Sequence, residues 1–251
     1  MNSPLKQVIH VENDEKSLNW RWYPQVKQDM EGITVCSMEY EVPQLIHDKV
    51  LPSNVQVGEI LVKSPYDEKY IRIGEYEKTI MQDKIYYVEE VARLLGASKV
   101  ESSIKITDIK KRNWDAEIGA MKVDLGEIDA KMRKEDESRL SQELIITSNY
   151  SNAKVPTIDD YKKAESYALA HNLLYDSGVK NLLETRNPSE NNLLTDRTIH
   201  LNLSSELESN LDIAFKLNVL QGVFNLNTSF NMKERYSKTV VLELKYVFAM
   251  P

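Results

Sequence analysis

Residues 211–232 read LDIAFKLNVLQGVFNLNTSFNM, and this stretch decides the predicted fold. Large apolar side chains recur at every second position on both sides of Gln221–Gly222, and mostly polar residues fill the positions between them. Alternation with a period of two is typical of a strand with one apolar and one polar face. The stretch therefore predicts a β-hairpin with strands at 211–219 and 223–232.

Two flanking segments carry the same alternation. Ile199, Leu201 and Leu203 alternate with polar residues, and so do the apolar side chains of 240–248. We predict that both segments join the hairpin in a sheet of about four antiparallel strands. One face of this sheet is apolar and the other is polar, as in a sheet that is covered on one side.

A second strand-rich region precedes this sheet in the sequence. Residues 100–109 alternate as a strand, and residues 140–150 are expected to return as its partner. The segment 115–146 has two interpretations. A change of phase at Gly126 indicates a strand with a bulge, whereas frequent Glu, Lys, Ala and Leu favour a helix. The sequence leaves both interpretations open.

A helical insert separates the two strand-rich regions. Thr157 is placed to cap a helix and Asp160 lies at its third position, so a helix is expected from there to about His171. A second short helix, capped by Asp176 or Ser177, is expected to end before Asn187–Pro188. Together these two helices predict a helical insert near 157–186.

The N-terminal part mixes strands and helix. Strands are expected at 33–40, 55–62 and 69–73, with a loop at Pro43 and Pro52, followed by a helix at 83–95 that ends at Gly96. Residues 1–30 are polar around an aromatic island, and we expect them to form an edge segment or lid. The aromatic residues of this island are a candidate partner anchor, namely Trp20, Trp22 and Tyr23.

These patterns predict an α+β fold class. Its main element is a predominantly antiparallel, long-stranded sheet with the helical insert near 157–186 and a mixed α/β N-terminal part. Two domains are expected, a mixed α/β part at 1–98 and antiparallel hairpins with the insert at 99–251, or else one continuous domain.

Composition limits the partners of the chain. Its 251 residues carry a formal net charge of −7, so the whole-molecule field does not attract nucleic acid, and no nucleic-acid partner is expected. The single cysteine, Cys36, lies in an apolar alternation and is expected to be a buried reduced thiol. The first residues lack the apolar region of a signal peptide, and we expect a cytoplasmic location.

No local motif predicts an enzyme. The chain has 8 glycines and no glycine-rich phosphate loop, and its four histidines stand at no metal-ligating spacing, so no cofactor and no metal are expected. His47–Asp48 resembles a catalytic pair with Cys36 or a serine as nucleophile, but such pairs arise by chance in chains of this size. No catalytic residue is predicted, and an enzyme whose residues meet only in space remains a further alternative.

Strand length suggests what the sheet does. The hairpin strands run about ten residues, against the usual ~5 to 6, and tilted strands of ~9 to 11 residues can cross a bilayer. The layout of two hairpin regions, at 100–150 and 198–248, around a helical insert resembles pore-forming domains of the gasdermin and perforin-like type. That resemblance implies two hairpin regions that refold into membrane strands.

The sequence thus gives two expectations of function. The first is a non-enzymatic binding or self-assembling protein that acts through sheet surfaces and edges, with a protein partner or a second copy of itself. The alternative is a pore-forming effector that inserts two amphipathic hairpin regions into a membrane. The candidate membrane or partner face consists of Leu211, Ile213, Phe215, Leu217, Val219, Phe224, Leu226 and Phe230.

Overall fold

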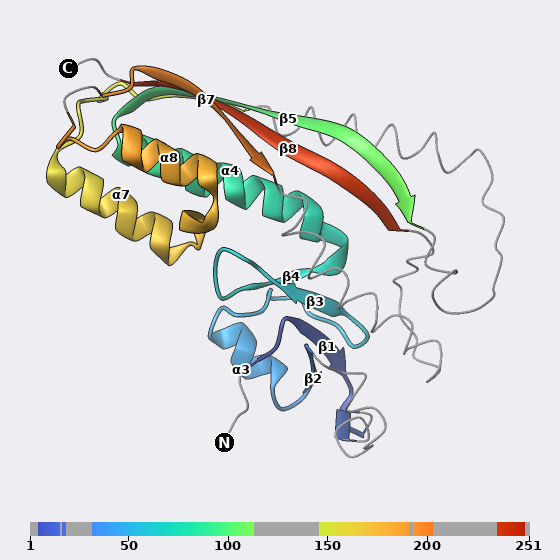
Figure 1. Cartoon of the computed structure of the whole chain (residues 1–251). Coiled ribbons are helices and arrows are strands. Elements are labelled where there is room, and N and C mark those ends of the chain that lie inside the picture. The colour runs from blue at the N-terminus through green and yellow to red at the C-terminus, as the bar shows by residue number, and fades with distance from the viewer. Residues whose placement is uncertain are drawn as a thin grey trace. The chain divides into compact units, whose positions relative to one another are not determined.

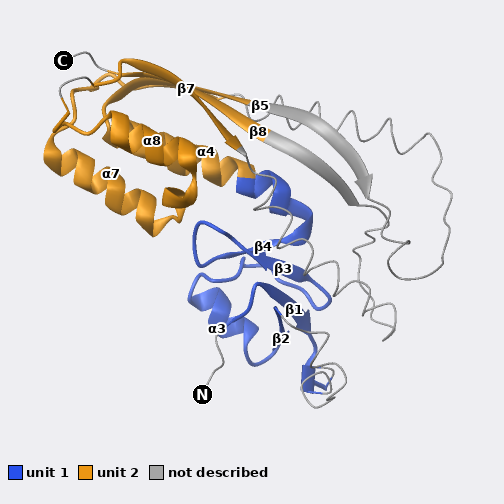
Figure 2. Ribbon diagram, in the orientation of Figure 1, with its two compact units in different colours: residues 1–80, 205–233 blue, residues 81–204, 234–251 orange. Residues whose placement is uncertain are grey.

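The computed structural model describes residues 5–15, 17–18, 32–112, 146–190, 193–202 and 235–248, of which 104–112, 202 and 235–240 are described by their backbone alone (Figure 1). The chain divides into two compact units (Figure 2). The first comprises residues 1–80 and 205–233, and the second comprises 81–204 and 234–251. Helices and two mostly antiparallel four-stranded sheets confirm the α+β fold class.

The first unit contains a mixed sheet with the strand order β2-β1-β3-β4. Its strands are β1 (Val8–Glu12), β2 (Ile33–Ser37), β3 (Ile60–Lys63) and β4 (Tyr70–Arg72), and β1 is parallel to β2 and antiparallel to β3. The expectation that residues 1–30 form an edge segment or lid was wrong for 8–12, because β1 is an inner strand. Every residue of β1 is buried, and a strand covered on both faces shows no alternation.

Two further predictions in the first unit were wrong in detail. The expected loop at Pro43 contains a helix, α3 (Val42–His47), in which Pro43 occupies the first turn. A proline there costs no hydrogen bond, because the first turn has no internal acceptor for its nitrogen. The strand expected from Val55 begins only at Ile60, after a turn in which Gly58 has a φ of 90°.

The apolar core of the first unit explains why these elements form. Ile9 and Val11 of β1 and Leu61 of β3 pack together with the other buried members of one cluster, which are Cys36, Val42, Leu51, Val55 and Tyr70. Cys36 is free and buried, as predicted. On the other side of β1, His10 and Glu12 are buried as well, and His10 Nε2 lies 3.1 Å from Glu12 Oε1.

The second unit is built on an antiparallel sheet with the order β6-β5-β8-β7. Its strands are β5 (Ala97–Arg112), β6 (Ile146–Asn149), β7 (Asp196–Asn202) and β8 (Arg235–Phe248). The strands predicted at 100–109 and 240–248 are confirmed and are longer than expected, at 16 residues for β5 and 14 for β8. The predicted hairpin at 211–232 and the segment 115–145 lie outside the described residues.

The helices of the second unit confirm the predicted insert. The first of them, α7 (Ile158–Ala170), starts at the predicted capping box of Thr157 and Asp160, and the second, α8 (Ser177–Thr185), is capped by Asp176. Short 3-10 turns, η2 (Leu173–Tyr175) and η1 (Ile73–Glu75), precede α8 and α4 respectively. The helix expected at 83–95 is α4 (Tyr76–Leu94), which starts earlier because Tyr76 and Ile80 extend its buried stripe.

The helices of the second unit cover one face of its sheet. Figure 1 shows α4, α7 and α8 on the same side of the strands. Leu242, Leu244 and Tyr246 are fully buried toward this side, while Lys245 and Val247 are exposed on the other. This alternation is the one that the sequence of 240–248 predicts. No helix among the described residues is long and apolar enough to cross a membrane.

Candidate functional site

The residues predicted to carry function lie outside the part of the chain that the structure describes. These are the partner anchor, Trp20, Trp22 and Tyr23, and the apolar face, Leu211, Ile213, Phe215, Leu217, Val219, Phe224, Leu226 and Phe230. The structure does describe the strands to which the apolar face connects. Residues 203–234 join the end of β7 to the start of β8, and residues 113–145 join β5 to β6.

Both of these connections leave and re-enter the sheet at the same end. β5 ends at Arg112, which pairs with Arg235 at the start of β8. β6 begins at Ile146, opposite Ser102 of β5, and β7 ends at Asn202, opposite Val241 of β8. Since β5 and β8 are the two inner strands, the two connections belong to neighbouring strand pairs of one sheet.

The outer strand β6 presents backbone groups away from the sheet. Tyr150 N donates to Ser98 O over 2.8 Å just past the end of β6, and hydrogen-bonded pairs alternate with non-bonded pairs in an antiparallel ladder. Thr147 and Asn149 therefore point their N–H and C=O groups away from β5. Among the described strands, none pairs with this side of β6.

The other outer strand, β7, has the same property. Phe248 N donates to Thr195 O over 2.8 Å, so the alternation along β7 turns the backbone groups of Asp196, Thr198 and His200 away from β8. No described strand pairs with this side of β7 either. The sheet of the second unit thus carries two edges that fit strand addition.

The sheet face opposite the helices is charged. Lys99 Nζ lies 2.5 Å from Glu101 Oε1, and this bond together with the charge of Lys99 lowers the pKa of Glu101. Glu101 also stands opposite Lys245 in the register, and His200 stands opposite Glu243 with 3.7 Å between Nδ1 and Oε2. These partly exposed pairs of opposite charge suit contact with water. The edges of this sheet are therefore better candidates for partner binding than its charged face.

Beneath the sheet, two polar contacts link α4 to neighbouring segments. Lys84 of α4, whose side chain is 1% exposed, lies 2.9 Å from Asp176 at the start of α8. Farther along α4, Glu89 accepts a 2.6 Å hydrogen bond from the hydroxyl of Tyr150. Burial and the nearby Glu89 and Asp176 carboxylates raise the pKa of Tyr246 well above its usual value. The sequence signal for the buried Lys84–Asp176 pair was a lysine in the apolar stripe of α4, which sequence reasoning missed.

Arg186 is a second buried cation that the sequence did not single out. Its Nε and Nη2 donate to Leu95 O over 3.2 and 3.1 Å, and its Nη1 donates to Leu194 O over 2.7 Å. The guanidinium carbon lies 4.5 Å from the centre of the Phe248 ring. Burial lowers the pKa of Arg186. Its partners lie far apart in sequence. Arg186 therefore holds together the end of α4 and the segment that precedes β7.

The residues considered as a possible catalytic pair and nucleophile do not lie together in the described part of the chain. His47 is 83% exposed at the end of α3, beside Asp48, whereas Cys36 is buried in the apolar core. Asp159 and Asp160 lie in the first turn of α7, where Asp160 completes the predicted capping box with Thr157. The described residues contain no group of three or more His, Cys, Asp or Glu side chains that could hold a metal ion.

Comparison with known proteins adds no relative. No protein-family model, no curated protein and no solved structure matches this chain.

Proposed function

We propose that this protein is a non-enzymatic binding protein that assembles with copies of itself through the edges of the β6-β5-β8-β7 sheet. The observation that supports this proposal is the direction of the strands. β5 is antiparallel to both β6 and β8, and β8 is antiparallel to β7, so β6 and β7 run in opposite directions.

This geometry makes the two edges complementary. If β7 of one copy lies beside β6 of the next copy, the two strands are antiparallel and their outward backbone groups meet. The antiparallel pattern then continues across the junction, with the charged face on one side and the helices on the other. Such a head-to-tail contact generates a closed ring or an open filament, depending on the rotation between copies.

Proline variants test this edge pairing. In Thr147→Pro the outward N–H of β6 is removed while the bonds between β6 and β5 stay intact, so we expect a smaller assembly than in the wild type. Thr147→Val is the matched control, because it keeps the N–H. His200→Pro and His200→Gln form the same pair on β7. Light scattering coupled to size-exclusion chromatography measures the mass of each variant.

The masses of the wild type and of the four variants decide whether the sheet edges mediate assembly. Loss of oligomers in the two proline variants alone supports edge pairing. A wild-type protein that stays monomeric at all concentrations, with and without liposomes, contradicts self-assembly. Oligomers of unchanged mass in both proline variants contradict the role of the edges.

A second candidate function is membrane insertion. The observation that favours it is that residues 113–145 and 203–234 emerge at one end of the sheet from neighbouring strand pairs. Extension of these strands would continue the sheet into a ribbon whose alternating apolar side chains match a lipid face, as expected for 211–232. Under this second proposal, pairing of the sheet edges between copies and insertion of the extended strands into a membrane are two steps of one process.

Dye release from liposomes tests insertion. Phe215→Asp charges the predicted apolar row and is expected to abolish release, because a charge on a lipid-facing strand is costly. Asn227→Asp places the same charge on the predicted polar face and is expected to retain release. Equal loss of release in both variants, or a wild-type protein that forms oligomers and leaves liposomes intact, contradicts the membrane function.

The predicted aromatic anchor needs a test that spares β1. Deletion of residues 1–24 would remove this inner strand, so the substitutions Trp20→Ala and Trp22→Ala are the better change. If these residues bind a partner, thermal unfolding is expected to stay nearly unchanged while partner capture is lost. A large loss of stability would instead assign them to the core.

A further inference from the structure

A pocket of about 340 Å³ lies in the second unit, at the end of β6 where Asn149 forms part of its lining. Its wall is formed by the end of α4, the turn into β5, the end of β6 with the segment that follows it, and the first turn of α7. Its lining includes Arg93, Gly96, Ser151, Asn152, Lys154 and Asp160. The volume lies at the lower end of the range for small-molecule sites, which is roughly 300 to 1,000 Å³.

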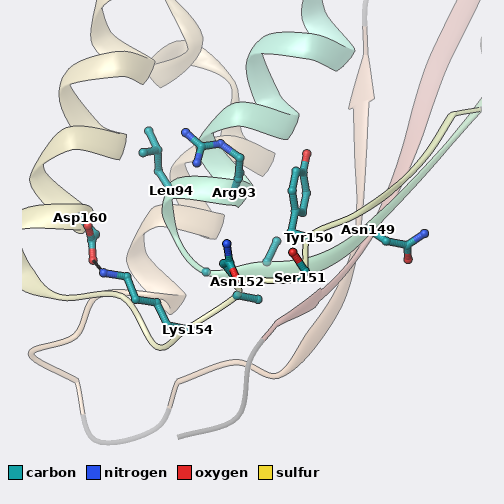
Figure 3. Close-up of a pocket in the computed structure, with 11 residues that line it drawn as sticks. Arg93, Leu94, Asn149, Tyr150, Ser151, Asn152, Lys154 and Asp160 are labelled. Carbon is teal, nitrogen blue, oxygen red and sulfur yellow. Dashed lines mark ion pairs between the residues drawn. The ribbon is translucent and has the colours of Figure 1, made fainter.

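The two cations of the pocket are held in place by carboxylates. Arg93 donates from Nε and Nη2 to the two oxygens of Glu90, over 2.7 and 2.5 Å. Lys154 Nζ lies 3.1 Å from Asp160 Oδ2. Figure 3 shows the two side chains pointing toward each other. These ion pairs orient both side chains before any ligand arrives, which lowers the entropy lost on binding.

Arg93 and Lys154 each keep hydrogen-bond donors that no described residue uses. Within the described residues, Nη1 of Arg93 makes no hydrogen bond, and the ammonium of Lys154 contacts only Asp160. The side chains of Ser151 and Asn152 likewise make no hydrogen bond to the described part of the chain. Figure 3 places the Asn152 amide between the side chains of Tyr150 and Lys154.

The carboxylates at the pocket are already engaged. Asp160 Oδ2 accepts from the backbone and side chain of Thr157 as well as from Lys154, and these bonds lower the pKa of Asp160 to about 2. Both oxygens of Glu90 accept from Arg93. The groups of the pocket that can still form hydrogen bonds are therefore mainly donors, and two of these donors belong to the cations Arg93 and Lys154. Charged donors of this kind favour an anionic acceptor.

From this arrangement we infer that the pocket binds a small oxyanion, a carboxylate or phosphate group, between Arg93, Asn152 and Lys154. The neighbouring Glu90 and Asp160 carboxylates weaken the local positive potential, so we expect weak binding. Salt should weaken it further, because Arg93 and Lys154 are 46% and 67% exposed and their charges are screened. None of the three proposed contact residues belongs to β6 or β7, so the proposed anion contacts differ from the edge contacts of the proposed assembly, although Asn149 at the end of β6 also lines the pocket.

Nuclear magnetic resonance of the full chain, labelled with ¹⁵N, tests the site. Sodium phosphate and, separately, sodium acetate are titrated at constant ionic strength set with sodium chloride. We expect saturable shifts confined to the amides of Gly96, Asn152 and Lys154. The two arms show whether phosphate or carboxylate is preferred, and either preference supports the inference.

Three variants make the result specific. Asn152→Asp puts a negative charge on an exposed side chain of the pocket, and we expect it to abolish the saturable shifts without unfolding the unit. The double substitution Arg93→Gln with Lys154→Gln is expected to do the same. Lys162→Gln, on an exposed position of α7 outside the pocket, is the control and should bind like the wild type.

Two results would overturn the inference. The first is the absence of saturation with both anions, with small shifts spread over the whole surface. The second is saturable binding that persists unchanged in Asn152→Asp and in the double variant, since the anion would then lie elsewhere.

Discussion

Replacement of Gly96 by alanine is expected to destabilise the second unit strongly. Gly96 has a φ of 85°, and a Cβ built there would lie 2.0 Å from the backbone oxygen of Lys154. The left-handed backbone costs an L-residue ~1 to 2 kcal/mol, and overpacking adds ~1 to 3 kcal/mol. The sum is a loss of roughly 2 to 5 kcal/mol in the free energy of unfolding. A backbone oxygen cannot rotate away, so the segment after β6 has to move.

Two other glycines calibrate this prediction. A Cβ at Gly74 would meet nothing within 4 Å, so Gly74→Ala is expected to change stability by no more than ~0.5 kcal/mol. At Gly178 a Cβ would lie 2.8 Å from Cδ2 of Leu201, a side-chain atom that can shift. Gly178→Ala is therefore expected to fall between the other two, at ~1 kcal/mol.

Urea unfolding followed by circular dichroism measures all three variants under one set of conditions. The expected order of destabilisation is Gly74→Ala, then Gly178→Ala, then Gly96→Ala. A Gly96→Ala protein as stable as Gly74→Ala would refute the close approach of Lys154 to the turn, and with it the wall of the proposed pocket.

Three further predictions concern ionisable groups. Lys84→Met leaves the Asp176 carboxylate without its buried cation and is expected to cost ~3 to 5 kcal/mol in urea unfolding; a loss below ~1 kcal/mol contradicts the buried pair. The pKa of Asp160 is lowered from 3.8 to about 2, so its stabilising effect is complete above pH 3.8 and fades toward pH 2. Asp160→Asn should remove this part of the acid dependence seen by circular dichroism, and an unchanged acid profile argues against the capping bonds. Burial raises the pKa of the Tyr70 hydroxyl from 10.0 to about 12, so its contribution to the free energy of unfolding is complete below pH 10 and is lost toward pH 12. Tyr70→Phe should therefore reduce the loss of stability between pH 10 and pH 12, measured by circular dichroism. An unchanged alkaline profile would contradict the burial of this hydroxyl.

Local signals in the sequence predicted the helices and strands of the second unit well. The Thr157–Asp160 capping box and the Asp176 cap act over three or four residues, so their effect can be read without knowledge of the fold. The alternation in 240–248 is equally local, because each side chain of a half-covered strand faces either water or the core.

The first unit shows where such signals fail. β1 is buried on both faces and contains His10 and Glu12, so its sequence neither alternates nor looks apolar. The start of α3 at Val42–Pro43 was interpreted as a loop because proline breaks helices in their interior but not in their first turn. In both places, the neighbours that surround the segment decide its structure.

The sequence by itself determined the α+β class, the helical insert, the buried state of Cys36 and the approximate place of the long strands. These features depend on periodicity and capping, which act between residues close in the chain. Only the tertiary structure decided the order β6-β5-β8-β7, the buried partners of Lys84 and Arg186, and the pocket beside Gly96. Each of these joins residues far apart in sequence, and such contacts leave no local pattern because their free energy comes from burial and pairing in the folded chain.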